Sequence, residues 1–169
     1  MRALLPLVLA ACLSSSSDDG GPASDAAGPD AGSACSMTLS GGLTGTLPCT
    51  VAAAKNDGDS FSIFAGMSST ASSTVMQVVF SLRVPGEIEI REYPGTSLDP
   101  AAIMLTTTDS RIFVASSGGT QGTIGTLRIT ALQLMPADGP TRIWTPRGSF
   151  NATLVGTTAG GTVMMSVTF

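Results

Sequence analysis

Histidine is absent from the 169 residues, and lysine occurs once, as Lys55. Without histidine the chain has no Ser-His-Asp or Cys-His catalytic site, no imidazole ligand for a metal, and no side chain that ordinarily titrates near pH 7. The three cysteines are too few for a Cys₄ zinc site. These absences exclude common classes of hydrolase and metal centre, and we expect no cofactor.

Charge is also scarce, because Asp, Glu, Lys and Arg together make up 12% of the chain and the formal net charge is −4. Residues 35–169 hold eight acidic and seven basic side chains, with no basic cluster. Such a nearly neutral segment lacks the electrostatic footprint of a nucleic-acid-binding protein. It also lacks the polybasic patch that attracts anionic lipids. We therefore expect no nucleic-acid partner.

The first twelve residues have the build of a secretory signal peptide. Arg2 precedes an apolar stretch over 3–11 that ends in small residues. As a helix these nine residues would rise only ~14 Å, against a hydrocarbon core of ~30 Å, so they are too short to span a membrane.

The ending Leu9-Ala10-Ala11-Cys12 resembles the lipobox of bacterial lipoproteins. The resemblance implies that the Cys12 thiol receives a diacylglyceryl group and that the chain is cut before Cys12. It further implies a bacterial cell-envelope protein whose partner is the membrane, through acyl chains on Cys12. Leu13, rather than Asp, follows the cysteine and favours the outer membrane. The alternative is a non-lipidated signal peptide that is cut earlier, with Cys12 later in a disulfide.

Composition then predicts three segments: the signal peptide over 1–11, a lipidated cysteine and tether over 12–34, and one β domain over 35–169. Residues 13–34 are almost entirely Ser, Asp, Gly, Ala and Pro. They cannot bury enough apolar surface to offset their ordering entropy, so we expect a disordered tether spanning ~25 Å on average. The remaining 135 residues are enough for one domain with one core.

Cys35 and Cys49 are expected to form a disulfide, since exported chains fold in an oxidising compartment. The residues between them alternate apolar and small polar side chains around Gly41-Gly42. A hairpin centred on Gly42, with a loop of three or five residues, places Cys35 opposite Cys49; a two-residue turn would pair Cys35 with Pro48 instead. The alternative is two buried free thiols.

Alternation with a period of two dominates the rest and predicts an all-β fold. In the stretch 73–84, one face carries Met76, Val78, Phe80, Leu82 and Val84, and the opposite face carries Gln77. With Leu127, Ile129, Phe150, Leu154 and Val167, that first face should form the core. Further strands are expected over 61–65, 87–93, 111–116, 123–134, 142–145, 149–155 and 162–169. Asp99-Pro100 begins either a helical turn or a strand over 103–107. An antiparallel β-sandwich is the expected architecture, with a small partly open β-barrel as the alternative.

Few polar groups are candidates for chemistry. Glu87 and Glu89 could serve as an acid pair in glycoside hydrolysis, but their alternation with Ile88 indicates the solvent face of a strand. Oxygen atoms of Asn56, Asp57 and Asp59 could bind calcium, but their spacing is not that of a known calcium loop, and a turn built on Asp-Gly is the better interpretation. We predict no catalytic residue and no metal site. Asn151 begins a glycosylation sequon and should point outward.

The segments 125–130 (GTLRIT) and 148–154 (GSFNATL) are similar to strands of small β-rich bacterial lipoproteins of unknown function. That resemblance implies the same architecture and export and supplies no catalytic residue. We expect a non-catalytic binding or surface-structural module with a protein or polysaccharide partner. The alternatives are a carboxylate-based hydrolase acting on envelope polymers, and a carrier whose apolar cavity is lined by Met76, Phe80 and Ile129.

Overall fold

The computed structural model describes residues 35–68, 72–118, 121–137, 139–157 and 160–169. The expected signal peptide and tether over 1–34, including Leu9, Ala10, Ala11 and Cys12, lie outside the described residues. The elements are β1 (Cys35–Gly41), β2 (Gly45–Asn56), β3 (Phe61–Ser68), β4 (Val75–Pro85), β5 (Glu92–Tyr93), the 3₁₀ turn η1 (Gly95–Ser97), β6 (Ala101–Thr107), β7 (Ile112–Ser116), β8 (Thr123–Ile124), β9 (Leu127–Met135), β10 (Thr141–Gly156) and β11 (Thr162–Thr168).

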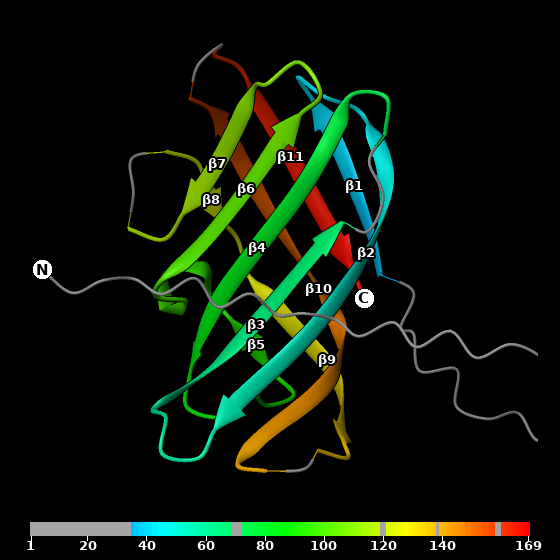
Figure 1. The fold of residues 1–169 in the computed structure, drawn as a ribbon. Coiled ribbons are helices and arrows are strands. Elements are labelled where there is room, and N and C mark those ends of the chain that lie inside the picture. Colours follow the sequence, from blue (N-terminus) through cyan, green and yellow to red (C-terminus); the bar gives the residue numbers. More distant parts are fainter. Residues whose placement is uncertain (1–34, 69–71, 119–120, 138, 158–159) are drawn as a thin grey trace, which may run out of the picture.

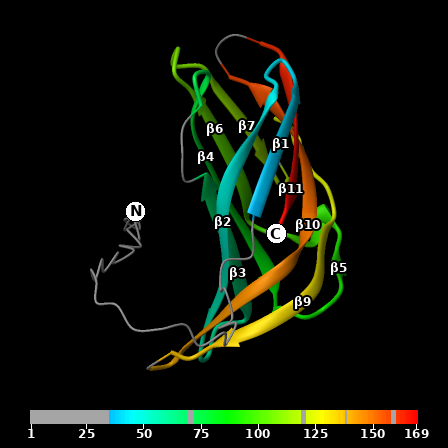
Figure 2. The same ribbon diagram turned by 90° about the vertical axis from the view of Figure 1, so that its right-hand side faces the viewer.

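All eleven strands belong to one antiparallel sheet, in the order β11-β1-β2-β3-β4-β6-β7-β10-β9-β5, with β8 paired to β10. The sheet folds back on itself because β10 also pairs with β11 and with β2. Figures 1 and 2 show the result as two layers, with β2, β3, β4 and β6 facing β1, β11, β10 and β9. The all-β antiparallel prediction is confirmed. The two layers are parts of a continuous sheet, and its extension through β9 and β5 distinguishes it from a regular barrel.

The core lies between the layers and centres on four phenylalanines. Phe80 on β4 lies 4.9 Å from Phe150 on β10 and 5.8 Å from Phe64 on β3, measured between ring centroids. Phe169 at the end of the chain lies 5.0 Å from Phe64. Such edge-on and offset contacts add to the free energy gained from burying the rings. The aromatic cluster therefore joins β3, β4, β10 and the C-terminal residue.

Gly66 makes room for this cluster. It pairs with Phe80 across β3 and β4. A Cβ at residue 66 would collide with the Phe80 ring and with the Thr50 carbonyl oxygen. Glycine therefore lets the ring lie directly against the backbone of β3.

Most of the expected core face of β4 is confirmed: Val78, Phe80, Leu82 and Val84 are all buried. So are the residues expected to join them, namely Leu127, Ile129, Phe150, Leu154 and Val167. The prediction is wrong for Met76, whose side chain is 52% exposed. The pairing with β6 shifts between Val75 and Gln77, and this bulge reverses the alternation, so that Val75 is buried in place of Met76.

The expected strand over 87–93 is wrong except for its last two residues, which form β5. In this segment the backbone bonds to side chains instead of to a neighbouring strand. Ser62 Oγ accepts a hydrogen bond from the Ile88 N–H (3.2 Å). Similarly, the Tyr93 hydroxyl accepts one from the Glu89 N–H (2.7 Å). The segment is thus tied to the core as a loop, with Ile88 buried and Ile90 exposed.

Three further boundaries differ from expectation. Residues 101–107 are strand β6, so the alternative of a helical turn after Asp99-Pro100 is wrong. The expected strand over 123–134 divides into β8 and β9, because the pairing with β10 shifts by one residue between Ile124, opposite Ala152, and Ile129, opposite Gly148. The two strands expected over 142–145 and 149–155 are one, β10, with a register shift at Arg147 and Gly148. The strands expected over 61–65, 111–116 and 162–169 are present as β3, β7 and β11.

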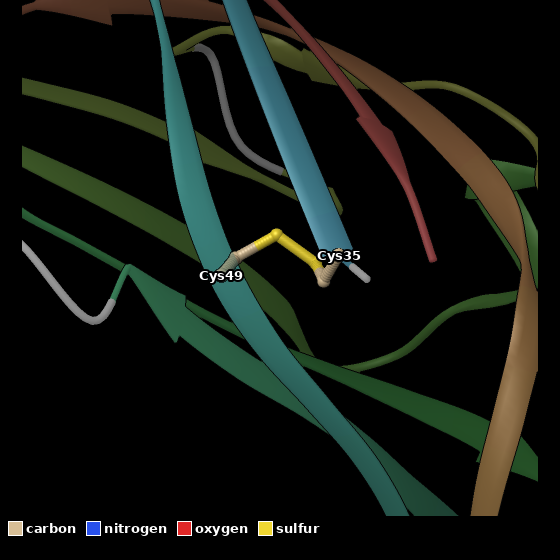
Figure 3. Close-up of a disulfide and its surroundings, with 2 residues drawn as sticks. All are labelled: Cys35 and Cys49. Atoms are coloured by element: carbon tan, nitrogen blue, oxygen red, sulfur yellow. A yellow bond between two sulfur atoms is a disulfide. The ribbon is translucent and has the colours of Figure 1, made fainter. Parts of the chain in front are cut away.

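The hairpin of β1 and β2 has the expected register. Cys35 lies directly opposite Cys49, with a Cα–Cα distance of 4.8 Å and a disulfide between them (Figure 3). The last paired residues are Leu39 and Gly45, so five residues form the loop. The disulfide prediction is confirmed, and the alternative of two free thiols is not.

Replacing both cysteines with serine should lower the free energy of unfolding by ~3 kcal/mol, because the disulfide closes a loop of about 15 residues in the unfolded chain. Urea denaturation of the wild-type protein and of the Cys35→Ser/Cys49→Ser variant measures the difference. Peptide mapping without reductant provides the control and should recover the two cysteines linked. Recovery of both as free thiols would contradict the assignment.

Replacing Phe80 with alanine should lower the free energy of unfolding by ~3–5 kcal/mol, because the surrounding rings cannot collapse into the cavity. Gln77→Ala is the matched control on the same strand. Gln77 is exposed, so its replacement should change stability by less than ~0.5 kcal/mol. Chemical denaturation of both variants measures the contrast, and similar losses in the two would refute the assigned core.

Candidate functional site

The carboxylates considered for acid–base chemistry each lie against a cation. Arg142 Nη2 is 2.5 Å from Glu87 Oε1, and Lys55 Nζ is 3.8 Å from the same oxygen. Glu89 pairs with Arg91, with 3.5 Å between Oε2 and Nε. These partners neutralise the carboxylates and join the loop after β4 to β2 and β10. The arrangement is that of a structural ion-pair network.

The acidic turn after β2 also contributes to this network, since Asp57 Oδ1 lies 3.7 Å from Arg142 Nε. Among the residues that the structure describes, no group of three or more Cys, Asp or Glu side chains could hold a metal ion. Asp109 lies elsewhere, in the turn after β6. Hydrogen bonds from Thr107 and Arg111 hold the pKa of its carboxyl below the usual range, which favours the charged form.

The residues proposed for an apolar cavity do not come together. Phe80 and Ile129 are buried in the core, whereas the bulge in β4 turns Met76 to the outer surface. The three side chains therefore cannot line one cavity, and the expectation of such a cavity is wrong.

A shallow groove of about 370 Å³ lies on the outer surface of β1, β11 and β10. Its outward-pointing side chains are Thr38, Ser40, Asn151, Thr153, Met164 and Ser166. Figure 1 shows these three strands together in the rear layer of the molecule. The groove is open to solvent and lies on the outer face of the sheet.

Strand register builds the groove from two rows of residues. Ser166 of β11 lies between Thr38 and Asn151, and Met164 lies between Ser40 and Thr153. The intervening residues Leu39, Ala152 and Met165 point into the core, so the outer face receives mainly short polar side chains. Short side chains extend only a little way from the backbone of the strands, so the surface is hollow there.

The lining carries no charge. Neither β1 nor β11 contains a charged residue, and the last charged residue of β10 is Arg147. The groove offers hydroxyl groups, one carboxamide and one thioether, and the Met164 side chain is 54% exposed. These groups donate and accept hydrogen bonds with neutral ligands, and the thioether provides an apolar contact.

Gly125 supports the edge of the groove. Its N–H donates to the Asn151 carbonyl (2.9 Å), and a Cβ there would collide with Asn151 Oδ1. The Asn151 side chain therefore lies over Gly125, and it is exposed as expected for this residue. The sequence singles out Asn151 but does not reveal the groove, because β1 and β11 are far apart in the chain. The absence of charge from both segments was the available signal.

Comparison of the chain with protein-family models, with curated proteins and with solved structures gave no match. In the described part of the chain, no helix is long and apolar enough to cross a membrane. The groove and the N-terminal motif are therefore the features that bear on function.

Proposed function

We propose that this protein is a lipid-anchored, non-catalytic binding module of the bacterial cell envelope, held in the outer membrane by acyl chains on Cys12. The groove on β1, β11 and β10 is its binding surface. The observation that carries this proposal is a hollowed sheet face lined by hydroxyl, amide and thioether groups, without a charged side chain.

The anchor is supported by Leu9-Ala10-Ala11-Cys12 and by the disulfide of the domain. A Cys35–Cys49 bond suits a protein that folds outside the reducing cytoplasm. Two or more acyl chains hold a protein firmly in a membrane, whereas one chain binds marginally. A tether over 13–34 would let the domain reach ligands a short way from the bilayer.

The ligand that matches the groove is a neutral polysaccharide of the envelope. Sugar hydroxyls can exchange hydrogen bonds with Thr38, Ser166 and Asn151, and the apolar face of a sugar ring can lie against Met164. An uncharged groove offers no attraction to phosphate or carboxylate groups, so it favours neutral over anionic polymers. An open groove also suits a long polymer better than a small molecule.

Replacing Cys12 with serine should remove the membrane anchor. The wild-type protein should partition into detergent and show, by intact mass, an added diacylglyceryl group on Cys12. The Cys12→Ser protein should be unprocessed or soluble, because serine has no thiol to alkylate. A wild-type protein without lipid on Cys12 would contradict the anchor, whatever its binding properties.

Replacing Asn151 and Ser166 together with alanine should weaken binding to neutral polysaccharide by roughly tenfold or more, because two hydrogen-bonding side chains of the groove are removed. Gel electrophoresis through dextran, β-glucan or unmodified agarose measures the retardation of the protein by each polymer. The control is Ser73→Ala, at an exposed position before β4 and outside the groove, which should be retarded like the wild type. Equal migration of all three proteins in every polymer would refute the proposed ligand class.

A further inference from the structure

We propose that the outer face of β2, β3, β4, β6 and β7 is the interface of a symmetric dimer of this chain. This face lies on the layer opposite the groove, at the front of Figure 1. It carries Ile63, Met67, Met76 and Met104, which are half of the large hydrophobic side chains exposed among the described residues. An exposed apolar surface of this kind marks an interaction site.

The apolar side chains form a ridge that crosses five strands. Strand register places Thr50, Met67, Val79, Met104 and Val114 side by side in one row. Met67 is 44% exposed and Met104 is 46% exposed. The row contains no charged residue, and its two methionines are flexible enough to adapt to an opposing surface.

A valley of small residues runs beside the ridge. The next outward positions on the same strands are Ala52, Ala65, Ser81, Ala102 and Ser116, again in one row. Alanine and serine leave the sheet backbone close to the surface. The face therefore presents a ridge and a parallel valley about two residues, or ~7 Å, apart along the strands.

This pattern is complementary to itself. A two-fold axis parallel to the rows, midway between ridge and valley, places the ridge of each copy against the valley of the other. Met104 of one copy then faces Ala102 of the second copy, and Met67 faces Ala65. The strands of the two sheets run nearly aligned, which is a common mode of sheet packing. The same patch serves both copies, as a closed dimer requires.

The size and charge of the face suit a stable contact. Beside the two full rows lie two shorter ones: Ala54, Ile63 and Arg83 next to the valley, and Gln77, Thr106 and Ile112 next to the ridge. Together the four rows cover ~520 Å² per copy, or ~1,000 Å² in total, at ordinary strand spacings. A specific interface needs at least ~1,000 Å². The one charged side chain within the four rows is Arg83, whose guanidinium lies over the Phe61 ring at 3.6 Å from its centroid. The interface would therefore leave no unpaired carboxylate buried.

The dimer also suits the proposed lipid anchor, and the placement of the two anchors rests on that proposed function. On this face β2 lies at one end of each row. Rotation about an axis parallel to the rows keeps that end of both copies on the same side of the dimer. Cys35 lies beside that end, because β1 pairs with β2 and Cys35 is opposite Cys49. Both tethers would then leave toward one membrane, and two anchors would hold the dimer more firmly than one. The groove stays open on the outer side of each copy.

The molar mass of the mature protein in density-matched detergent, measured by sedimentation equilibrium, tests the proposal. The wild type should have twice the chain mass. Met104→Glu, which buries a charge in the ridge, and Ala102→Trp, which fills the valley, should each reduce the mass to one chain. Thermal unfolding of each variant checks that it is folded. Ile90→Glu is the control, because Ile90 is 63% exposed and lies in the loop that is hydrogen-bonded, through the Arg91 carbonyl, to Ile129 on the other layer.

A wild type that stays monomeric at all concentrations would overturn the proposal, as would equal dissociation of the Ile90→Glu control. Dimers that persist in both folded interface variants would also overturn it. A monomer that binds phosphatidylethanolamine vesicles, and loses this binding with Met104→Glu, would assign the face to lipid instead. The measurement does not depend on Cys12, so absence of the lipid anchor would leave the dimer result interpretable.

Discussion

The long strand β10 is the constraint on which the rest of the fold depends. Its sixteen residues pair with β9, β2, β8, β7 and β11 at different points along its length. The sheet can turn back on itself because one strand provides partners for both layers. At Gly148 the strand exchanges two backbone hydrogen bonds with Phe169. That exchange brings the last residue of the chain to the aromatic cluster, where its ring lies beside Phe64.

Once the two layers enclose the core, their outer faces are free to differ. The groove on one layer and the ridge and valley on the other are nearly uncharged, and both follow from strand register rather than from any local motif. Over β1, β11 and β10 the outward residues are short and polar, so the surface is hollow and suits a hydrated ligand. Over β3, β4 and β6 methionines stand beside alanines, so the surface suits a matching protein face. Charged side chains gather instead around the Arg142 network, in the turns, and on the neighbouring strands β9 and β5.

Local regularity was not enough to decide which expectations held. In 78–84 every second residue is apolar, and the structure buries those residues as expected. The alternation over 87–93 is equally clear, yet Ser62 and Tyr93 bind the backbone there and exclude a ladder. The prediction that Met76 is buried is wrong because β4 has one extra residue, the bulge between Val75 and Gln77. The alternation of apolar and polar residues cannot by itself reveal a bulge or a competing side-chain hydrogen bond. Both depend on partners that are distant in the chain.

The sequence by itself determined the all-β class, the alternating core of β4 and the pairing of Cys35 with Cys49. These features rest on neighbours within one strand or one hairpin, whose geometry follows from a period of two and a short loop. Only the tertiary structure decided that the strands join into one folded-back sheet, that Ser166 lies between Thr38 and Asn151, and that Met67 lies in a row with Met104. Those contacts join strands far apart in the chain, and their register is set by packing of the whole core.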